Sequence, residues 1–220
     1  MNTGIDIETI PTQNKELLDY VGRSVKPPAT IKKQETLNDW YENKYSEALS
    51  EAVNKLSFDG GFNHIITLSA WVSDDLNCVF HAESVEQEGD VIQNYMDWIS
   101  KNISFKGRWI GHNIIGFDLR VIKQRCMVLG IKPFSGLRFD AKPWDDNPYD
   151  TMLRWNSDRQ NMTSMDKLCR IFGIEGKGDM DGSQVYQAWL DNKHAEIKDY
   201  CLDDAKKSVL IFNRMEGIYE

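Results

Sequence analysis

The chain has 220 residues, a length that fits one domain with a substantial buried core. Its hydrophobic fraction of 41% and charged fraction of 27% are those of a soluble globular protein, which excludes a largely disordered chain. The formal net charge of −8 argues against a protein that binds nucleic acid by charge alone. It does not exclude a metallonuclease, because bound divalent ions return positive charge where a phosphate lies.

Neither export nor membrane insertion is expected from the sequence. The first residues lack the basic and apolar regions of a signal peptide, and the most apolar window, residues 64–72, is too short to span a bilayer. The cysteines Cys78, Cys126, Cys169 and Cys201 lie far apart and form no CxxC pair. Because zinc fingers and disulfide frameworks use close spacing, we expect reduced, buried thiols and a cytoplasmic protein.

The first 60 residues are predicted to form a strand followed by an insertion. Residues 4–11 alternate apolar and acidic side chains before a proline, which predicts a strand. Residues 12–60 look like an insertion into a single domain that spans residues 1–220. Within the insertion, residues 26–30 form a loop with two prolines, and residues 36–56 carry the apolar spacing of a helix.

The rest of the chain is predicted to contain both strands and helices. Strands are expected at 64–73, 77–82 and 107–111, and helices at 86–101, 117–129, 164–172, 183–192 and 195–219. Residues 133–150 are rich in Pro, Gly and Asp and are expected to be irregular, as is the loop 175–182. Strands followed by alternating helices and strands predict an α/β domain with a mixed sheet.

Two acids interrupt the first predicted strand. Asp6 and Glu8 are two residues apart, so on a strand their side chains face the same side. Two neighbouring carboxylates repel each other unless a cation lies between them. Taken alone, this DxE pattern fits an exposed edge strand better than a metal site.

A further acid follows the strand predicted at 107–111. Asp118 lies in the first turn of the next helix, and Asn113 lies in the connecting turn. Each also has an ordinary structural interpretation, because a helix dipole favours an acid at its start and asparagine suits a turn. His112 is interpreted as a residue at the strand end rather than as a ligand.

The third candidate segment lies on the helix predicted near the C-terminus. Tyr200 and Asp204 are four residues apart and therefore share one helix face. Asp204 is thus placed to bind a metal while Tyr200 reaches the water beside it. Asp203 points roughly 100° away and is expected to be solvated. As an isolated pair, Tyr200 and Asp204 fit an ordinary helix surface.

Taken together, the three segments resemble the DEDD superfamily of exonucleases. DxE in a strand, N-x-x-x-F-D at a strand-to-helix junction and YxxxD in a late helix occur in that order. The tyrosine subtype is the match, because Asp199 stands five residues before Asp204, where the histidine subtype has histidine. Residues 6–11, the Pro27-Pro28 loop and Gly111-His112-Asn113 are similar to predicted exonucleases related to the proofreading domain of family B DNA polymerases. The resemblance implies a ribonuclease H-like (DnaQ-like) α/β fold, a mixed five-stranded sheet flanked by helices.

The resemblance also implies catalysis with two divalent ions, Mg²⁺ or Mn²⁺. By analogy, Asp6 bridges both ions, and Glu8 and Asp204 complete the site on the side of the nucleophile. Asp118 holds the second ion. Tyr200 orients the attacking water, and its phenol, with an ordinary pKa of about 10, is not expected to be the main proton acceptor.

Four further residues are implied to bind the substrate. Backbone N–H groups near Thr9 and Ile10 would contact the terminal nucleotide, with the Ile10 side chain packing on its sugar or base. Asn113 would bind a phosphate, and Lys177 lies where related enzymes keep a lysine that meets the scissile phosphate. The remaining clustered basic residues are interpreted as solvated helix faces, with steering of a single strand toward the site as the alternative: Arg120, Lys123, Arg125, Lys198, Lys206 and Lys207.

The sequence therefore predicts a 3′→5′ exonuclease that releases 5′-mononucleotides from a nucleic-acid 3′ end, with single-stranded DNA favoured. An exoribonuclease that trims RNA is an alternative, because a contact with the 2′-hydroxyl depends on geometry rather than on a motif. A non-catalytic nucleic-acid-binding domain is a second alternative, but it would be expected to lack at least one of the four acids. An endonuclease of the wider ribonuclease H-like group would lack the YxxxD helix.

Overall fold

The computed structural model describes residues 1–157, 162–176, 178 and 180–217, and these residues form a sheet of five strands. The strand order is β3-β2-β1-β4-β5, with β1 at the centre. β1 pairs antiparallel with β2 and parallel with β4, whereas β3 joins antiparallel to β2 and β5 parallel to β4. The strands span Asn2–Pro11 (β1), Asn63–Ser73 (β2), Leu76–His81 (β3), Arg108–Gly111 (β4) and Tyr149–Asp150 (β5). This confirms the predicted mixed five-stranded sheet.

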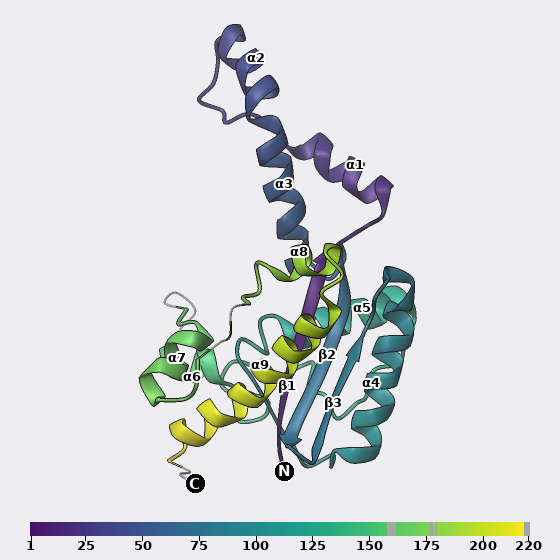
Figure 1. Cartoon of the computed structure of the whole chain (residues 1–220), viewed down its shortest axis with the longest axis vertical. Helices are drawn as coiled ribbons and strands as arrows, with labels where there is room; N and C mark the ends of the chain where they lie inside the picture. The colour runs from purple at the N-terminus through teal and green to yellow at the C-terminus, as the bar shows by residue number, and fades with distance from the viewer. Residues whose placement is uncertain (158–161, 177, 179, 218–220) are drawn as a thin grey trace.

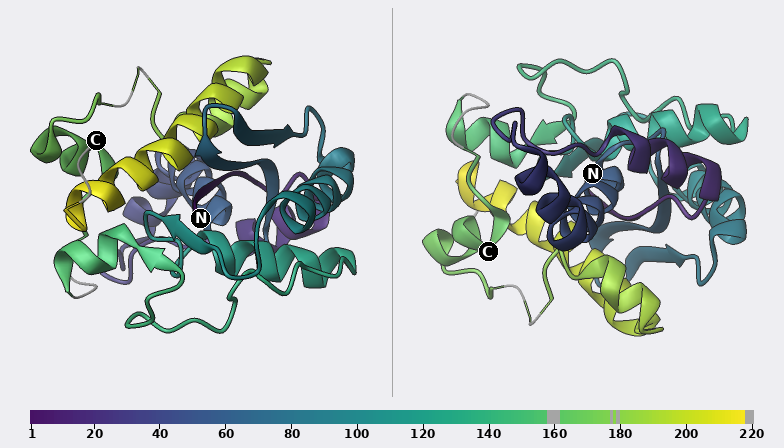
Figure 2. Two further views of the ribbon diagram at one scale, coloured as in Figure 1. Left: turned by 90° about the horizontal axis from the view of Figure 1, so that it is seen from below. Right: turned by 90° about the horizontal axis from the view of Figure 1, so that it is seen from above.

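Helices cover both faces of the sheet (Figures 1 and 2). α4 (Glu88–Asn102) and α5 (Asp118–Leu129) form the main core with one face, while α9 (His194–Met215) crosses the other and contacts β1 and β2. The shorter helices are α6 (Thr151–Asn156), α7 (Met165–Phe172) and α8 (Val185–Leu190). Beyond residue 60 the predicted elements agree with these bounds within a few residues, except that β5 and α6 are not predicted from the sequence. The helix prediction at 195–219 extends past the last described residue, 217.

Alternation along β1 decides which helix layer each of its side chains meets. Ile5 and Ile7 are buried in the core beneath α4 and α5. Asp6 and Glu8 alternate with them and therefore face the α9 side of the sheet. The alternative of an exposed edge strand is excluded, because β1 is the central strand.

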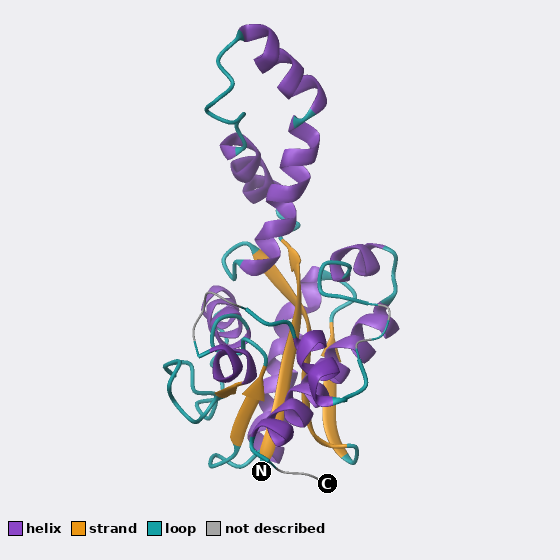
Figure 3. Ribbon diagram, turned by 90° about the vertical axis from the view of Figure 1, so that its left-hand side faces the viewer, coloured by secondary structure: helices purple, strands orange, loops and turns teal. Residues whose placement is uncertain are grey.

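Residues 12–60 form a helical arm that projects beyond one end of the sheet (Figures 1 and 3). Its helices are α1 (Lys15–Ser24), α2 (Gln34–Asn43) and α3 (Tyr45–Lys55), and a 3₁₀ turn at Leu56–Phe58 leads back to β2. The prediction of one helix over 36–56 is wrong, because the backbone leaves helical geometry at Lys44 (φ −122°, ψ −22°). α1 is not predicted from the sequence. It begins after Asn14, whose side chain accepts two backbone N–H groups of the first turn.

Arg125 is buried rather than solvated, contrary to the interpretation of its helix face. Only 5% of it is exposed, and its guanidinium donates two hydrogen bonds of 2.7 Å to the Glu88 carboxylate. The same carboxylate contacts His64 Nδ1 at 2.8 Å. This cluster joins the start of α4, the middle of α5 and the start of β2. The partner of Arg125 lies 37 residues away, so helix periodicity alone does not reveal it.

Lys207 is likewise buried, and Asp203 is not simply solvated. The Lys207 ammonium group is held by the Asp203 carboxylate and by the Gly176 carbonyl oxygen, which lies 2.8 Å away. This contact anchors the loop before α8 to helix α9. The prediction of a solvated face for Lys207 is therefore wrong, because the loop returns over that side of the helix.

The cysteines agree with the expectation of reduced thiols. All four are free, and Cys126, Cys169 and Cys201 are buried. Across the ranges that the structure describes, no helix combines the length and the apolar character needed to cross a membrane.

Candidate active site

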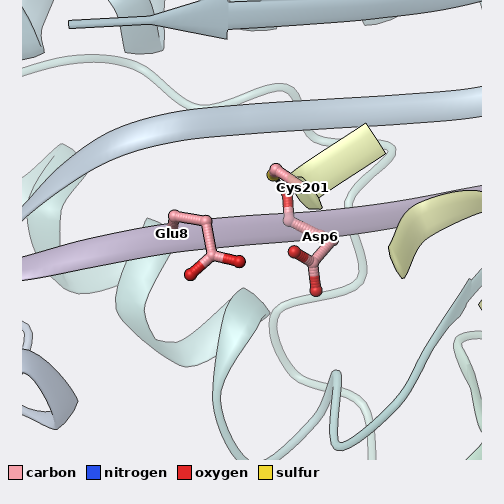
Figure 4. Close-up of side chains that lie close together, drawn as sticks. All are labelled: Asp6, Glu8 and Cys201. Atoms are coloured by element: carbon pink, nitrogen blue, oxygen red, sulfur yellow. Dashed lines mark hydrogen bonds between the residues drawn. The ribbon is translucent and has the colours of Figure 1, made fainter. Parts of the chain in front are cut away.

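Asp6 and Glu8 lie close together on the central strand (Figure 4). Their carboxylates are on the same side of β1, and an oxygen of each lies within 4.8 Å of the other and of the Cys201 sulfur. The register of β1 against β2 shifts directly after Glu8, where Ile66 on β2 has no partner in the pairing. The DxE motif thus presents two carboxylates to one position.

Helix α9 reaches this pair because β1 has a glycine where the two elements cross. A Cβ atom on Gly4 would lie 2.0 Å from the carbonyl oxygen of Ala205, so a side chain there would push the helix away. A second contact fixes the position along the strand, because the Ser69 hydroxyl on β2 donates a hydrogen bond of 2.9 Å to the Cys201 carbonyl oxygen. The close crossing brings the YxxxD motif next to Asp6.

Tyr200 and Asp204 are buried on the side of α9 that faces β1. They are 9% and 4% exposed, and the Tyr200 hydroxyl donates a hydrogen bond to the Asp204 carboxylate. Burial raises the pKa of Tyr200 well above its usual value, and the charges of Glu8, Asp204 and Asp6 raise it further. Tyr200 is therefore a buried, protonated hydrogen-bond donor that lies near the carboxylates of the first motif, not a surface residue.

Asp118 enters the same site from the first turn of α5, and only 3% of it is exposed. Burial raises the pKa of Asp118 to about 8, and the negative charges of Asp150 and Asp204 add to this effect. Hydrogen bonds from the backbone N–H groups of Asp118 itself and of Ile7 on β1 lower this pKa, but they do not outweigh burial. All three motifs therefore meet. A buried carboxyl group with a raised pKa is typical of a functional site.

The site offers oxygen ligands suited to hard divalent cations. Asp6 and Glu8 bring a carboxylate oxygen each within 4.8 Å of the other, and Asp204 lies close enough to raise the pKa of both Tyr200 and Asp118. Repulsion between neighbouring carboxylates is relieved when a cation binds between them. Cys201 is a poor ligand here, because burial raises the pKa of its thiol well above the usual range and the thiol donates to the Asp6 carbonyl oxygen at 3.4 Å. Mg²⁺ and Mn²⁺ prefer carboxylate oxygens, whereas zinc sites use thiolates and imidazoles.

The sequence does not predict a further buried carboxylate near the site, that of Asp150. This residue ends β5, is 2% exposed and caps α6 by accepting the N–H groups of Met152 and Leu153, both at 3.1 Å. It also accepts the N–H groups of Asn113 at 3.1 Å and Ile115 at 3.2 Å. Asp150 thus ties the turn of the second motif to the neighbouring strand. Its one sequence signal is an acid before a short helix, and a strand of two residues has no detectable period.

Residues 58–219 match the family described as predicted 3′-5′ exonuclease related to the exonuclease domain of PolB. The match covers well over half of the chain. The chain belongs to this family. Asp118, Tyr200 and Asp204 lie inside the matched residues of the predicted exonuclease, while Asp6 and Glu8 precede them and join the site through the fold. The resemblance to predicted exonucleases related to the proofreading domain of family B DNA polymerases is confirmed.

The fold of this predicted exonuclease also occurs in the family B DNA polymerase from the hyperthermophilic archaeon Pyrobaculum calidifontis. The likeness has a TM-score of 0.60 at 18% sequence identity, and it covers 97% of this chain and 24% of the polymerase chain. The exonuclease thus spans about a quarter of the polymerase, and the likeness concerns the fold alone. No curated protein sequence matches the chain.

The residues expected to bind substrate take different positions in the predicted exonuclease. Thr9 lines a pocket beside the site, and Asn113 lies partly exposed in the turn before Asp118 with a left-handed backbone (φ 65°). Ile10 is fully buried in a cluster with Tyr200, so its side chain offers no surface to a sugar or base. The expected contact of that side chain is therefore corrected to a packing role. Lys177 lies outside the described residues.

Proposed function

We propose that this member of the family is a metal-dependent 3′→5′ exonuclease that releases 5′-mononucleotides, preferentially from single-stranded DNA. The observation that carries the proposal is the convergence of three motifs on one buried site. Asp6 and Glu8 come from β1, Asp118 from α5, and Asp204 with Tyr200 from α9. A binding domain that had lost catalysis would have no use for all four acids together.

The four carboxylates fit two divalent ions, Mg²⁺ or Mn²⁺. Following the family resemblance, Asp6, Glu8 and Asp204 would hold the ion on the nucleophile side, and Asp118 with Asp6 the other. Bound ions supply the activation of water and the stabilisation of the departing 3′ oxygen. Their charge also offsets the repulsion among the acids and allows a chain with a net charge of −8 to hold a phosphate.

Tyr200 orients the attacking water in this proposal. Its hydroxyl keeps its proton, because burial and three nearby carboxylates raise its pKa. It therefore acts through hydrogen bonds, between Asp204 and the water, rather than as a base. Replacing the hydroxyl removes orientation and leaves the carboxylate ligands in place.

Asn113, Lys177 and the backbone near Thr9 and Ile10 are the proposed contacts to the substrate. The position of Asn113, in the turn just before Asp118, supports a phosphate contact, and the proposal for Lys177 depends on the family resemblance. A cytoplasmic location is proposed as well, and it is supported by the free cysteines, because thiols stay reduced in that compartment.

Degradation of 5′-labelled single strands tests this function. With Mg²⁺ or Mn²⁺, single-stranded DNA should give a ladder that shortens from the 3′ end, and EDTA should abolish it. RNA of the same sequence should be cut more slowly, and a covalently closed DNA circle should survive. If linear strands survive in both metals, the chain is a nucleic-acid-binding domain. If the circle is cut, it is an endonuclease.

A further inference from the structure

A pocket of about 270 Å³ opens between the foot of the helical arm, residues 51–58, and helix α8. Phe58 lines it from the arm and Tyr186 from α8, and Thr9, the residue after Glu8, lines it from β1. Pockets for drug-sized ligands measure roughly 300–1,000 Å³. This smaller pocket, with two aromatic residues among mostly polar lining residues, suits a single planar ring system that also carries polar groups.

Two residues that line the pocket also contact residues of the candidate active site or its neighbours. Gly182 lines the pocket, and a Cβ atom built on it would lie 3.9 Å from the Tyr200 hydroxyl oxygen. On the other side, the Phe58 ring packs edge-to-face against Phe117 with 6.0 Å between the ring centroids. Phe117 directly precedes Asp118. A group in the pocket therefore lies next to Gly182, which adjoins the Tyr200 hydroxyl, and next to Phe58, which adjoins the residue before Asp118.

The foot of the arm is fixed to the rest of the domain by hydrogen bonds. The Thr9 hydroxyl donates to the Ser57 carbonyl oxygen at 2.7 Å. Arg120 donates to the Phe58 carbonyl oxygen at 3.0 Å and to the Gly116 carbonyl oxygen at 2.9 Å, so it joins the arm to the turn of the second motif. Phe58 is nevertheless 63% exposed, although its side chain is large and apolar. An exposed ring on a fixed backbone is suited to stacking on a ligand rather than to filling a core.

We propose that this pocket receives the base of the 3′-terminal nucleotide and that Phe58 stacks on it. The inference rests on the proposed exonuclease function and adds a residue of the arm to the substrate site. Stacking tolerates any base, because every base has a π face. An enzyme that shortens a strand residue by residue needs such tolerance. Holding the terminal base also directs the scissile phosphate toward the carboxylates.

The test uses two oligonucleotides, one with an ordinary 3′-terminal nucleotide and one with a tetrahydrofuran abasic analogue at that position. In Mg²⁺, the wild type should lose about fivefold to a hundredfold in kcat/KM on the abasic end, the range expected for one stacked base. Phe58→Ala should lose as much on the ordinary end and show no further loss on the abasic end. Phe58→Trp should keep the wild-type preference.

Phe105→Ala is the matched control, because Phe105 is similarly exposed, at 65%, and lies at the end of the sheet where β4 begins. It should keep the preference for the ordinary end. If Phe58→Ala prefers the ordinary end as strongly as the wild type does, the inference is overturned. Should urea unfolding show that Phe58→Ala does not fold, Phe58→Leu serves instead, since it keeps apolar packing but lacks a ring face.

Failure of the exonuclease proposal gives a different result. A wild type that cuts neither oligonucleotide in Mg²⁺ or Mn²⁺ overturns the activity. Fluorescence anisotropy of the same two oligonucleotides then tests whether the pocket binds the terminal base. Equal affinity of the wild type for both oligonucleotides overturns the inference. Weaker binding of the abasic oligonucleotide by the wild type, with no such difference in Phe58→Ala, supports it.

Discussion

The Asp150 carboxylate accepts the backbone N–H of Asn113 at 3.1 Å, across 37 residues of chain. Asn113 has a left-handed backbone with φ 65°, a conformation that few residues adopt without support. The other oxygen of Asp150 accepts the N–H of Ile115 at 3.2 Å. A side chain at the end of β5 therefore shapes the turn from which Asp118 enters the site.

Asp150→Asn should lower both stability and activity. The new amide group turns an N–H donor toward the N–H of Ile115, and a buried unsatisfied donor costs about 1–3 kcal/mol. Urea unfolding should show this loss. The shifted turn should reduce kcat about tenfold to a hundredfold. Asp97→Asn, on the exposed side of α4, should change neither quantity, whereas a wild-type kcat for Asp150→Asn would show that the turn does not depend on this carboxylate.

Gly4→Ala should separate α9 from β1. Its Cβ atom would lie 2.0 Å from the Ala205 carbonyl oxygen, so the helix must move and carry Asp204 away from Asp6. We expect a loss of about 1–3 kcal/mol in the free energy of unfolding and about a hundredfold in kcat. Gly89→Ala is the control, because nothing lies within 4 Å of its Cβ position and alanine favours the helix by about 0.5–1 kcal/mol. If Gly4→Ala has the same melting temperature and kcat as the wild type, the close crossing of α9 over β1 at Gly4 is contradicted.

The metal-free protein should become less stable as the pH rises, because of Asp118. Its pKa of about 8 lies above the ordinary value of 3.8, so the folded protein holds a proton that the unfolded chain has released. This stabilisation is fully present below about pH 3.8 and is lost as the pH rises through about 8. In EDTA near pH 8, Asp118→Asn should melt above the wild type, by about 2–4 °C for each kcal/mol.

The difference in melting temperature between Asp118→Asn and the wild type should shrink near pH 5, because the Asp118 carboxyl group is protonated there and its burial costs less free energy. Adding Mg²⁺ should raise the melting temperature of the wild type more than that of the variant, because the variant lacks one ligand. A difference in melting temperature that stays constant with pH would contradict the raised pKa of Asp118.

Glu88 should contribute much of the stability that is lost in acid. Burial raises its pKa, but hydrogen bonds from His64 and Arg125 outweigh burial and hold the pKa below the ordinary 4.5. Its contribution is therefore present above about pH 4.5 and is lost as the pH falls through the folded pKa. Glu88→Gln leaves Arg125 buried without a counter-charge and should cost about 3–5 kcal/mol near pH 7.

The exposed neighbour Glu86 provides the control for Glu88. Glu86→Gln should change the free energy of unfolding by less than about 0.5 kcal/mol. Urea unfolding at neutral and acidic pH measures both variants, and the stability of Glu88→Gln should vary less with pH than that of the wild type. Equal stability of Glu88→Gln and the wild type near pH 7 would show that the buried ion pair contributes nothing.

The sequence predicts those parts of the site that interrupt a local pattern. Asp6 and Glu8 stand out because they replace apolar residues in a strand, and Tyr200 and Asp204 because their spacing matches one helix face. The order of the motifs then indicates the sheet, since DxE must lie on a strand next to the strand that precedes Asp118. In the structure Asp6 and Glu8 lie together on β1, and Tyr200 and Asp204 face them from α9.

Contacts between distant segments are what the sequence leaves out. Arg125 looks like an ordinary polar helix residue until α4 brings Glu88 against it, and Asp150 looks like a loop acid until β5 pairs with β4. The role of Phe58 depends on how the foot of the helical arm packs against β1 and α8, which lie far from it in the sequence. Each of these features depends on long-range packing, which no local pattern records.

The most direct test of the central claim is the rate at which Asp204→Asn degrades 5′-labelled single-stranded DNA in Mg²⁺, compared with Asp199→Asn. Both substitutions remove one negative charge from α9, but Asp199 is exposed while Asp204 is buried at the site. If the acids and Tyr200 act together, Asp204→Asn loses about a thousandfold or more in kcat and Asp199→Asn keeps the wild-type rate. A folded Asp204→Asn that degrades the strand at the wild-type rate would contradict the account.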